Sequence, residues 1–298
     1  MDKPVSIAHI SDLHFSKTSL NFRQFFSKRW LGNLNLLLRR GKHFHPPLLD
    51  TLIEELQKDK VDYVLISGDV STTSKAEEFQ EAKTFVNKLA SLGYDVLTLP
   101  GNHDQYTRYD YKNQTFYEFF PHSFSQTEDQ FSHLNLKEHK IAVKKLNPHW
   151  SIILLDTAVA TSLTSSSGEF LPSLEKTLEE LLAQIPKDHH LIIANHFPLL
   201  SEDKPNRLLE RREPLKHLIQ KHSNIKLYLH GHSHYFSLID LRDHHLPILI
   251  DSGSTAHRKH GSFAMIDLYK NRFVVKEFRV TPSLHWEQVG IHEFLVKS

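Results

Sequence analysis

The sequence predicts an α/β fold in which two facing sheets lie between outer helices. Apolar runs of strand length alternate with amphipathic helical patterns over residues 5–99, and this alternation resumes over residues 151–229. From residue 238 onward, strand-like segments follow one another without helices. Alternating strands and helices are typical of parallel βαβ units, whereas consecutive strands are typical of antiparallel pairing.

The first half of the chain contains three predicted strands separated by two predicted helices. In order, they are strand 5–10, helix 46–58, strand 61–67, helix 75–92 and strand 94–99. Both helices are predicted because leucine, isoleucine, valine and phenylalanine recur every three or four residues and so share one face. Gly93 ends the second helix, and Pro100 with Gly101 ends the third strand.

The second half of the chain first repeats the alternation of strands and helices and then contains consecutive strands. Its first elements are strand 151–156, helix 171–185, strand 190–194, helix 211–222 and strand 225–229. Four consecutive antiparallel strands are predicted next, at 238–241, 246–251, 262–269 and 272–280, with a hairpin turn at 269–272. Since no internal repeat, low-complexity tract or linker divides the chain, we predict one domain over residues 1–298.

The composition of the chain is that of a globular protein and excludes several kinds of chemistry. Of the 298 residues, 39% are hydrophobic and 24% charged, which is enough for a sizeable core. The absence of cysteine excludes disulfides, thiolate metal sites and thiol nucleophiles. A net charge of +1 gives no sign of nucleic-acid binding, so nucleic acid is not an expected partner. With no leader-like N-terminus and no long apolar run, a cytoplasmic location is expected.

Five short motifs each place a metal-binding side chain directly after a predicted strand. They are Asp12-Leu13-His14, Gly68-Asp69, Gly101-Asn102-His103-Asp104, Asn195-His196 and Gly231-His232-Ser233-His234. In open α/β sheets, ligands gather at the carboxyl ends of the strands. We therefore expect all five motifs to converge at one edge of the sheets.

The side chains in these motifs suit two divalent cations. The expected ligands are two carboxylates, one carboxamide and four imidazoles: Asp12, Asp69, Asn102, His14, His196, His232 and His234. Asp12 and His14 are two residues apart in a segment expected to be extended, so their side chains would leave on the same side and hold one cation. Asp69 follows a glycine and is expected to bridge both. A hydroxide held between two such cations is a nucleophile near neutral pH and can attack a phosphodiester or a pyrophosphate.

Two residues beside Asn102 are candidates for proton transfer rather than for metal binding. We expect His103 to face the substrate, where it would protonate the leaving oxygen or hydrogen-bond a phosphoryl oxygen. Asp104 is adjacent in sequence and is expected to orient the His103 ring.

The five motifs resemble those of the calcineurin-like metallophosphoesterase family. The family pattern is D-x-H, G-D, G-N-H-D/E, a lone His and G-H-x-H, and all five are present here in order between residues 12 and 234. The resemblance implies the metallo-dependent phosphatase fold, a four-layer α/β/β/α sandwich of two mixed sheets. It also implies one metal held by Asp12, His14, Asp69 and His234 and another held by Asp69, Asn102, His196 and His232, with His103 as the acid. Mn²⁺ is the expected metal, with iron or Zn²⁺ as alternatives.

The resemblance leaves the substrate open. Similar family members include cyclic-nucleotide phosphodiesterases, membrane-docked lipid pyrophosphatases that act on UDP-2,3-diacylglucosamine, and broader phosphodiesterases. Other members are non-catalytic scaffolds that bind proteins after losing ligands, but no ligand is missing here. The expected partner is a small-molecule phosphoester or pyrophosphate, which can be lipid-linked. The chain lacks the additional domain of nuclease members, which argues against DNA cleavage.

Three further segments have both a functional and a structural interpretation. Residues 17–45 form a basic, amphipathic insert without acidic residues, which would either contact an anionic membrane peripherally or simply pack on the domain. Aromatic residues between 106 and 120 would stack a nucleobase, line an acyl pocket or form the core of a covering helix. His257 and Arg258 follow a predicted strand end and would contact substrate or lie at the surface.

Overall fold

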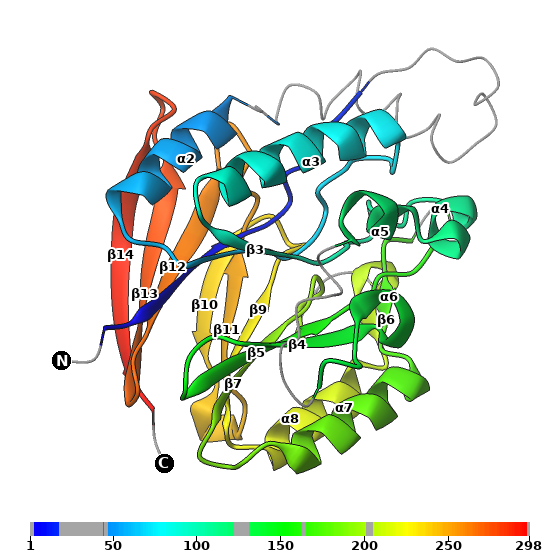
Figure 1. The fold of residues 1–298 in the computed structure, drawn as a ribbon, viewed down its shortest axis with the longest axis vertical. Coiled ribbons are helices and arrows are strands. Elements are labelled where there is room, and N and C mark those ends of the chain that lie inside the picture. Colours follow the sequence, from blue (N-terminus) through cyan, green and yellow to red (C-terminus); the bar gives the residue numbers. More distant parts are fainter. Residues whose placement is uncertain are drawn as a thin grey trace.

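Two six-stranded sheets face each other at the centre of the computed structural model, which describes residues 3–17, 44, 47–121, 131–162, 165–200 and 205–296. Helices α2 (Leu48–Lys58) and α3 (Ala76–Ser91) cover the outer side of the first sheet, at the top of Figure 1. Helices α7 (Pro172–Gln184) and α8 (Arg212–Lys221) cover the second sheet, at the bottom of Figure 1. The four layers confirm the α/β/β/α sandwich of two mixed sheets.

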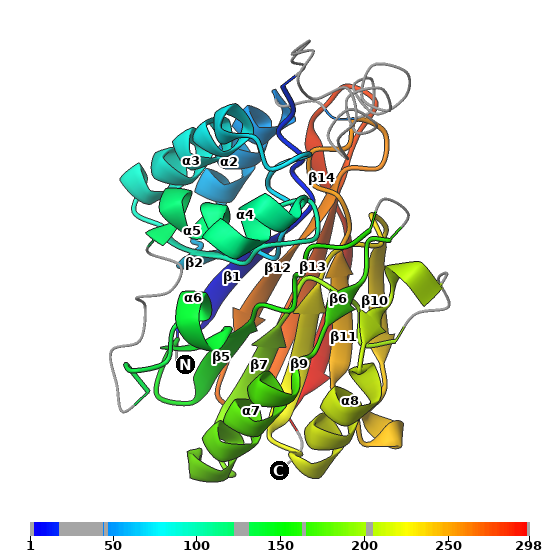
Figure 2. The same cartoon turned by 90° about the vertical axis from the view of Figure 1, so that its right-hand side faces the viewer.

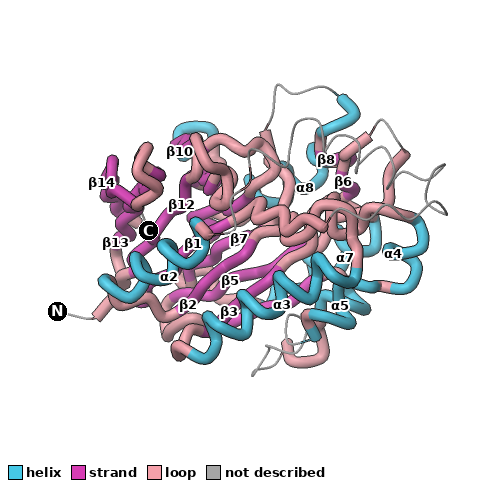
Figure 3. The backbone as a smooth tube through the Cα atoms, turned by 90° about the horizontal axis from the view of Figure 1, so that it is seen from above, coloured by secondary structure: helices cyan, strands magenta, loops and turns pink. Residues whose placement is uncertain are grey.

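The first sheet has the strand order β14-β13-β12-β1-β2-β3. Its strands are β1 (Val5–Ile10), β2 (Tyr63–Ile66), β3 (Asp95–Thr98), β12 (Ser262–Leu268), β13 (Arg272–Val280) and β14 (Trp286–Leu295). Strands β1, β2 and β3 are parallel, whereas β12, β13 and β14 join the other side of β1 in antiparallel pairs. Figure 3 shows α2 and α3 running beside β1, β2 and β3.

The second sheet has the strand order β10-β11-β9-β7-β5-β4. Its strands are β4 (Ile141–Lys145), β5 (Trp150–Leu155), β7 (His190–Ala194), β9 (Ile225–His230), β10 (Phe236–Asp240) and β11 (Ile248–Ser252). The four central strands are parallel, and β4 and β10 are antiparallel edges. Figure 2 shows α7 and α8 alongside β7 and β9, at the end of the molecule opposite α2 and α3.

Shorter elements complete the described structure. They are α4 (Arg108–Asn113), α5 (Thr115–Phe119), α6 (Leu136–His139), the small parallel pair β6 (Gly168–Glu169) and β8 (Leu209–Glu210), and the 3₁₀ turns η4 (Pro205–Arg207) and η5 (Arg242–His244). Within the described residues, no helix combines the length and apolar character needed to cross a membrane.

Alternation along the buried strands divides the core between the two sides of each sheet. On β5, Ile152 and Leu154 pack in the cluster that includes Ile7 of the first sheet, whereas Ile153 and Leu155 pack in the cluster that includes Leu178 of α7. Successive side chains of a strand point to opposite faces, so a strand covered on both sides must be apolar throughout. This requirement explains why the central strands were recognisable as continuous apolar runs.

The expectation of four consecutive antiparallel strands near the C-terminus was wrong in its pairing. Strands β10 and β11 do pair antiparallel, and so do β12 and β13 across the predicted turn, where the Tyr269 amide donates to the Arg272 carbonyl. However, β11 pairs in parallel with β9, while β12 crosses to the first sheet and pairs with β1. Local sequence patterns identify strands but do not specify which sheet each one joins.

The two ambiguous segments near the site have different outcomes. Phe116, Tyr117 and Phe120 are fully buried, and Phe119 stacks on Phe79 of α3, so the aromatic residues from 116 to 120 pack in the core, whereas Tyr109 is exposed. Of the insert at residues 17–45, the structure describes only Lys17 and Phe44. Of these, Lys17 forms an ion pair with Glu81 of α3.

Candidate metal centre

The five predicted motifs follow five strands that point toward the same end of the molecule. Asp12 and His14 follow β1, Asp69 follows β2, and the 101–104 motif follows β3. In the second sheet, the motif with His196 follows β7 and the 231–234 motif follows β9. Because β1, β2 and β3 are mutually parallel, as are β7 and β9, their carboxyl ends deliver the motifs to two facing sheet edges.

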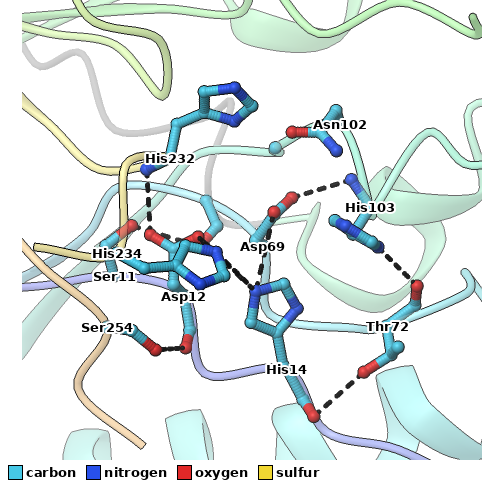
Figure 4. A network of polar contacts seen from close by, with 12 residues as sticks. Ser11, Asp12, His14, Asp69, Thr72, Asn102, His103, His232, His234 and Ser254 are labelled. Carbon is cyan, nitrogen blue, oxygen red and sulfur yellow. Dashed lines mark hydrogen bonds and ion pairs between the residues drawn. The ribbon is translucent and has the colours of Figure 1, made fainter. Parts of the chain in front are cut away.

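Four of the predicted ligands form one compact group. Asp12, His14, Asp69 and His234 each offer a donor atom, and these atoms all lie within 4.8 Å of one another. The His234 Nε2 atom is 3.1 Å from Asp12 Oδ1 and 3.2 Å from His14 Nε2. His14 Nε2 is in turn 3.8 Å from Asp69 Oδ2. Figure 4 shows these imidazoles and carboxylates facing one another, an arrangement that suits a shared cation.

The other three predicted ligands form a second group around His196, which lies next to Asp69. His196 Nε2 is 3.5 Å from Asp69 Oδ2 and 3.3 Å from Asn102 Oδ1. The His232 ring is edge-on to His196, with 5.2 Å between the ring centroids. Asp69 Oδ2 therefore stands between the two groups, which is the position that a bridging ligand requires.

Two carboxylate oxygens at the centre of this cluster fit a cation because they lack hydrogen-bond donors. In the described part of the chain, the buried Asp12 Oδ1 and Asp69 Oδ2 receive no aligned hydrogen bond, although imidazole nitrogens lie within 4 Å of both. Burying an ionised oxygen without a partner is costly unless a cation or a donor compensates it. The unsatisfied atoms and the mixed oxygen and nitrogen donors together fit divalent metals.

The electrostatics of the cluster keep its carboxylates negative. Burial, the largest single influence, would raise the pKa of Asp12, but the imidazoles of His234, His14 and His196 together outweigh it and hold the pKa well below its usual range. Asp69 behaves in the same way, with His196 as the main opposing group. Burial, the largest single influence, lowers the pKa of His196, but the combined effects of Asp69, Asp12 and the Ser67 carbonyl outweigh it and raise the pKa to about 9. For His232, burial and the nearby His196 lower the pKa to about 3. The cluster thus presents buried negative charge to any cation.

The backbone at the ligands is strained in a way that the sequence did not indicate. Asp12, His14, Asp69, His232 and His234 have φ angles of 55°, 48°, 53°, 73° and 65°. Such left-handed conformations cost non-glycine residues about 1 kcal/mol or more each and concentrate at functional sites. The expectation that the Asp12–His14 segment is extended was therefore wrong, although both side chains do reach the same group of donors.

Glycines before and after the ligands allow the loops to approach closely. Gly68 has a φ of 112°, and a Cβ atom there would lie 2.5 Å from His196 Nδ1. A Cβ atom on Gly101 would collide with the Asp69 carboxylate. The glycines of the Gly-Asp and Gly-Asn-His-Asp motifs are thus required by contact with the ligands themselves.

His103 lies at the rim of the cluster with its ring held by the backbone. Its amide donates to Asp69 Oδ1 at 2.7 Å, and its ring Nδ1 is 2.6 Å from the Thr72 carbonyl oxygen (Figure 4). A carbonyl only accepts, so Nδ1 carries a proton and Nε2 is the atom available for proton transfer. The ring also stacks on Tyr106, with 5.6 Å between the centroids.

The structure gives Asp104 a different role from the one expected. Its buried carboxylate accepts hydrogen bonds from the amides of Val70, Ser71 and Gly101 and from the Ser71 hydroxyl. Burial, followed by the negative charge of Asp69, raises its pKa to about 7. Asp104 thereby ties the loop after β2 to the loop after β3, while the Thr72 carbonyl orients His103. Sequence adjacency suggested the wrong partner because the side chains of neighbouring residues diverge.

Several groups that orient the ligands could not be found from the sequence. The Ser67 carbonyl fixes His196 through Nδ1 at 2.9 Å, and the Arg207 carbonyl lies 3.0 Å from His232 Nε2. Asp251 of β11 accepts a hydrogen bond from the Ser233 hydroxyl at 2.6 Å and lies beside His230. These contacts hold the 231–234 motif against β11. Such partners fix the orientation of ligating imidazoles. A backbone carbonyl is present in every residue, so the sequence does not reveal which carbonyls orient the ligands. Of these partners, only Asp251 is a polar side chain at a predicted strand end and could have been found from the sequence.

Comparison with known proteins agrees with this geometry. A family model described as calcineurin-like phosphoesterase matches residues 5–236. A 3′,5′-cyclic adenosine monophosphate phosphodiesterase of Vibrio vulnificus is 28% identical over 175 residues, which are 58% of this chain and 54% of that protein. A 3′,5′-cyclic-nucleotide phosphodiesterase of Nostoc is 23% identical over 233 residues, or 78% and 72% of the two chains.

A solved structure shares the fold over almost the whole length. The crystal structure of a dimetal phosphatase from Danio rerio has a TM-score of 0.66 at 15% identity and covers 99% of this chain and 100% of that one. At this identity the likeness shows the fold alone. The match to the family model extends over more than half of the sequence and includes all five motifs. The chain therefore belongs to the calcineurin-like phosphoesterase family.

Proposed function

We propose that this protein hydrolyses small-molecule phosphodiesters with the help of two bound divalent metals. The observation that supports this proposal best is the position of Asp69 Oδ2, a buried oxygen without a hydrogen-bond donor between two groups of donors. Asp12, His14 and His234 would hold one cation with Asp69. Asn102, His196 and His232 would hold the other.

Different residues of the chain would have different roles in hydrolysis. Bound divalent cations would supply charge stabilisation to the phosphoryl oxygens and lower the pKa of a water molecule. Water attacks phosphorus while the bond from phosphorus to the leaving oxygen breaks. In its imidazolium form, with Nδ1–H held by the Thr72 carbonyl, His103 donates its Nε2 proton to that oxygen, which leaves as an alcohol, and the attacking water gives up one proton to the solvent. Asp104 holds the loop after β2 and the loop after β3 in fixed positions relative to each other during this step.

The relatives favour a diester as the substrate. Both curated relatives are named phosphodiesterases that act on cyclic nucleotides, and a cyclic nucleotide is a diester. The match spans only about half the length of the Vibrio protein, so its activity is carried over to this chain as part of the proposal. A protein-binding scaffold on the same fold is disfavoured because every ligand of the family pattern is present.

A lipid-linked pyrophosphate is the remaining alternative from the sequence. That hypothesis depended on the basic insert at residues 17–45, which lies largely outside the described residues. It stays a prediction from the sequence, together with the peripheral membrane contact.

Metal dependence tests the proposed function directly. We expect protein purified with Mn²⁺ to hydrolyse bis-p-nitrophenyl phosphate and to lose that activity after treatment with EDTA and dialysis. Adding back Mn²⁺ should restore it, with Fe²⁺ and Zn²⁺ assayed in parallel because the same donors accept all three. The release of p-nitrophenolate is followed by absorbance. An unchanged rate after complete metal removal would contradict the proposal.

A further inference from the structure

A cavity of about 290 Å³ opens directly beside the metal-ligand candidate His234. It is lined in addition by Phe44, Arg207, Ser233, Tyr235, His257 and His260. The centroids of the Phe44 and His234 rings are 6.2 Å apart, so the cavity wall lies next to the candidate metal centre. A group attached to a phosphate bound there would extend into this space.

Flat rings form a nearly continuous wall around the cavity. His257 is stacked on His260 at 5.1 Å with an interplanar angle of 23°, and Phe44 meets His257 edge-on at 5.9 Å. Tyr235 continues the series, with its ring 6.4 Å from that of His260. Tyr235 is 67% exposed, so much of its ring is accessible to a ligand in the cavity. Flat faces of this kind favour stacking with another flat ring.

The orientation of His257 is fixed by the backbone of its own loop. Its Nδ1 accepts hydrogen bonds from the amides of Lys259 at 3.2 Å and His260 at 3.0 Å. A ring nitrogen that accepts carries no proton, so the neutral ring has its proton on Nε2. The ring of His257 therefore forms part of the cavity wall in an orientation that its own loop holds fixed.

One basic residue lines the cavity and also contacts a candidate metal ligand. Arg207 lines the cavity, and its backbone carbonyl lies 3.0 Å from Nε2 of the candidate ligand His232. Among the described residues that line the cavity, none is aliphatic. An acyl chain would therefore find no matching surface, whereas an anionic group attached to a flat ring would.

The geometry points to this cavity as the binding site for the nucleobase of a nucleotide diester whose phosphate lies at the metal centre. Tyr235, His257 and His260 would act as specificity-determining residues by stacking against the base. The inference rests on the proposed function and deepens it, since it selects nucleotides over aliphatic diesters such as glycerol phosphodiesters.

Paired substrates test this inference. We expect Tyr235→Ala to lower the ratio of kcat/KM for 3′,5′-cyclic AMP over that for glycerophosphocholine by about tenfold, the loss of one stacking contact. Tyr235→Phe keeps the ring and should keep the ratio. His260→Ala, further from the ligand motif, should lower the ratio in the same direction. As a matched control, Tyr109→Ala removes a tyrosine that is 71% exposed and does not line the cavity, and should leave the ratio unchanged.

A binding measurement separates the failure of this inference from failure of the proposed function. By isothermal titration of the Mn²⁺-loaded protein, we expect AMP to bind about tenfold more tightly than inorganic phosphate, and Tyr235→Ala to remove most of that preference. An active parent protein without this preference, or with equal ratios in the Tyr235→Ala and Tyr109→Ala variants, would overturn the nucleobase site. A parent that prefers AMP but hydrolyses neither diester would support the base site and contradict the proposed hydrolysis.

Discussion

Asp69→Asn is expected to lower metal-dependent hydrolysis of bis-p-nitrophenyl phosphate on the order of a thousandfold, equivalent to ~4 kcal/mol. One Asp69 oxygen is the unsatisfied atom between the two donor groups, and the other accepts the His103 amide. An asparagine keeps the shape but removes the charge, and its amide nitrogen cannot bind a cation. Both proposed cations would therefore lose a ligand in a single substitution.

The matched control for this experiment is Asp50→Asn. Asp50 lies on the exposed face of α2, where it pairs with Lys88, so the same chemical change occurs away from the site. Activity of the control should equal that of the parent, and circular dichroism should show both variants folded. Parent-like hydrolysis by a folded Asp69→Asn variant would contradict the proposed mechanism.

His103→Gln is expected to lower kcat by about a hundredfold to a thousandfold for a diester with an alkyl leaving group. An alkoxide leaves poorly unless it is protonated, and the structure holds the His103 ring with Nε2 available for that step. A p-nitrophenolate leaves readily without a proton, so hydrolysis of bis-p-nitrophenyl phosphate should fall much less. Steady-state rates with the two substrates measure the difference.

The size of that difference separates proton donation from positioning. If His103 only hydrogen-bonds a phosphoryl oxygen, the variant should lose the same factor with both leaving groups, and its role as an acid would be wrong. His133→Gln serves as the control because His133 is exposed. Its rates should match those of the parent with either substrate.

Much of the site was predictable because its chemistry is carried by side chains at strand ends. The central strands are buried on both faces, which makes them continuous apolar runs that end where the polar ligands begin. Each motif could therefore be assigned to the carboxyl end of a predicted strand. The carboxyl ends of parallel strands lie at the same edge of a sheet, so the motifs were expected to lie together. Strands β1, β7 and β13 have the predicted boundaries, and the main helices differ by only a residue or two at most ends.

Other features depend on contacts that a single sequence does not encode locally. Strand β14 was not predicted, because it is an edge strand whose side chains are mostly exposed and lack an apolar run. The roles of Thr72 and Ser67 rest on their carbonyls, which every residue possesses. The left-handed backbone of Asp12 and His14 is imposed by the surrounding loops. None of these features requires a particular residue type at a particular position, so a sequence pattern does not reveal it.

Anomalous X-ray diffraction from crystals grown with Mn²⁺ tests the central claim most directly. Data collected on both sides of the manganese absorption edge locate the metal independently of catalysis. We expect two anomalous peaks per chain on either side of Asp69, one beside Asp12, His14 and His234 and the other beside Asn102, His196 and His232. A single peak, peaks elsewhere or no peak at this cluster would contradict the two-metal centre.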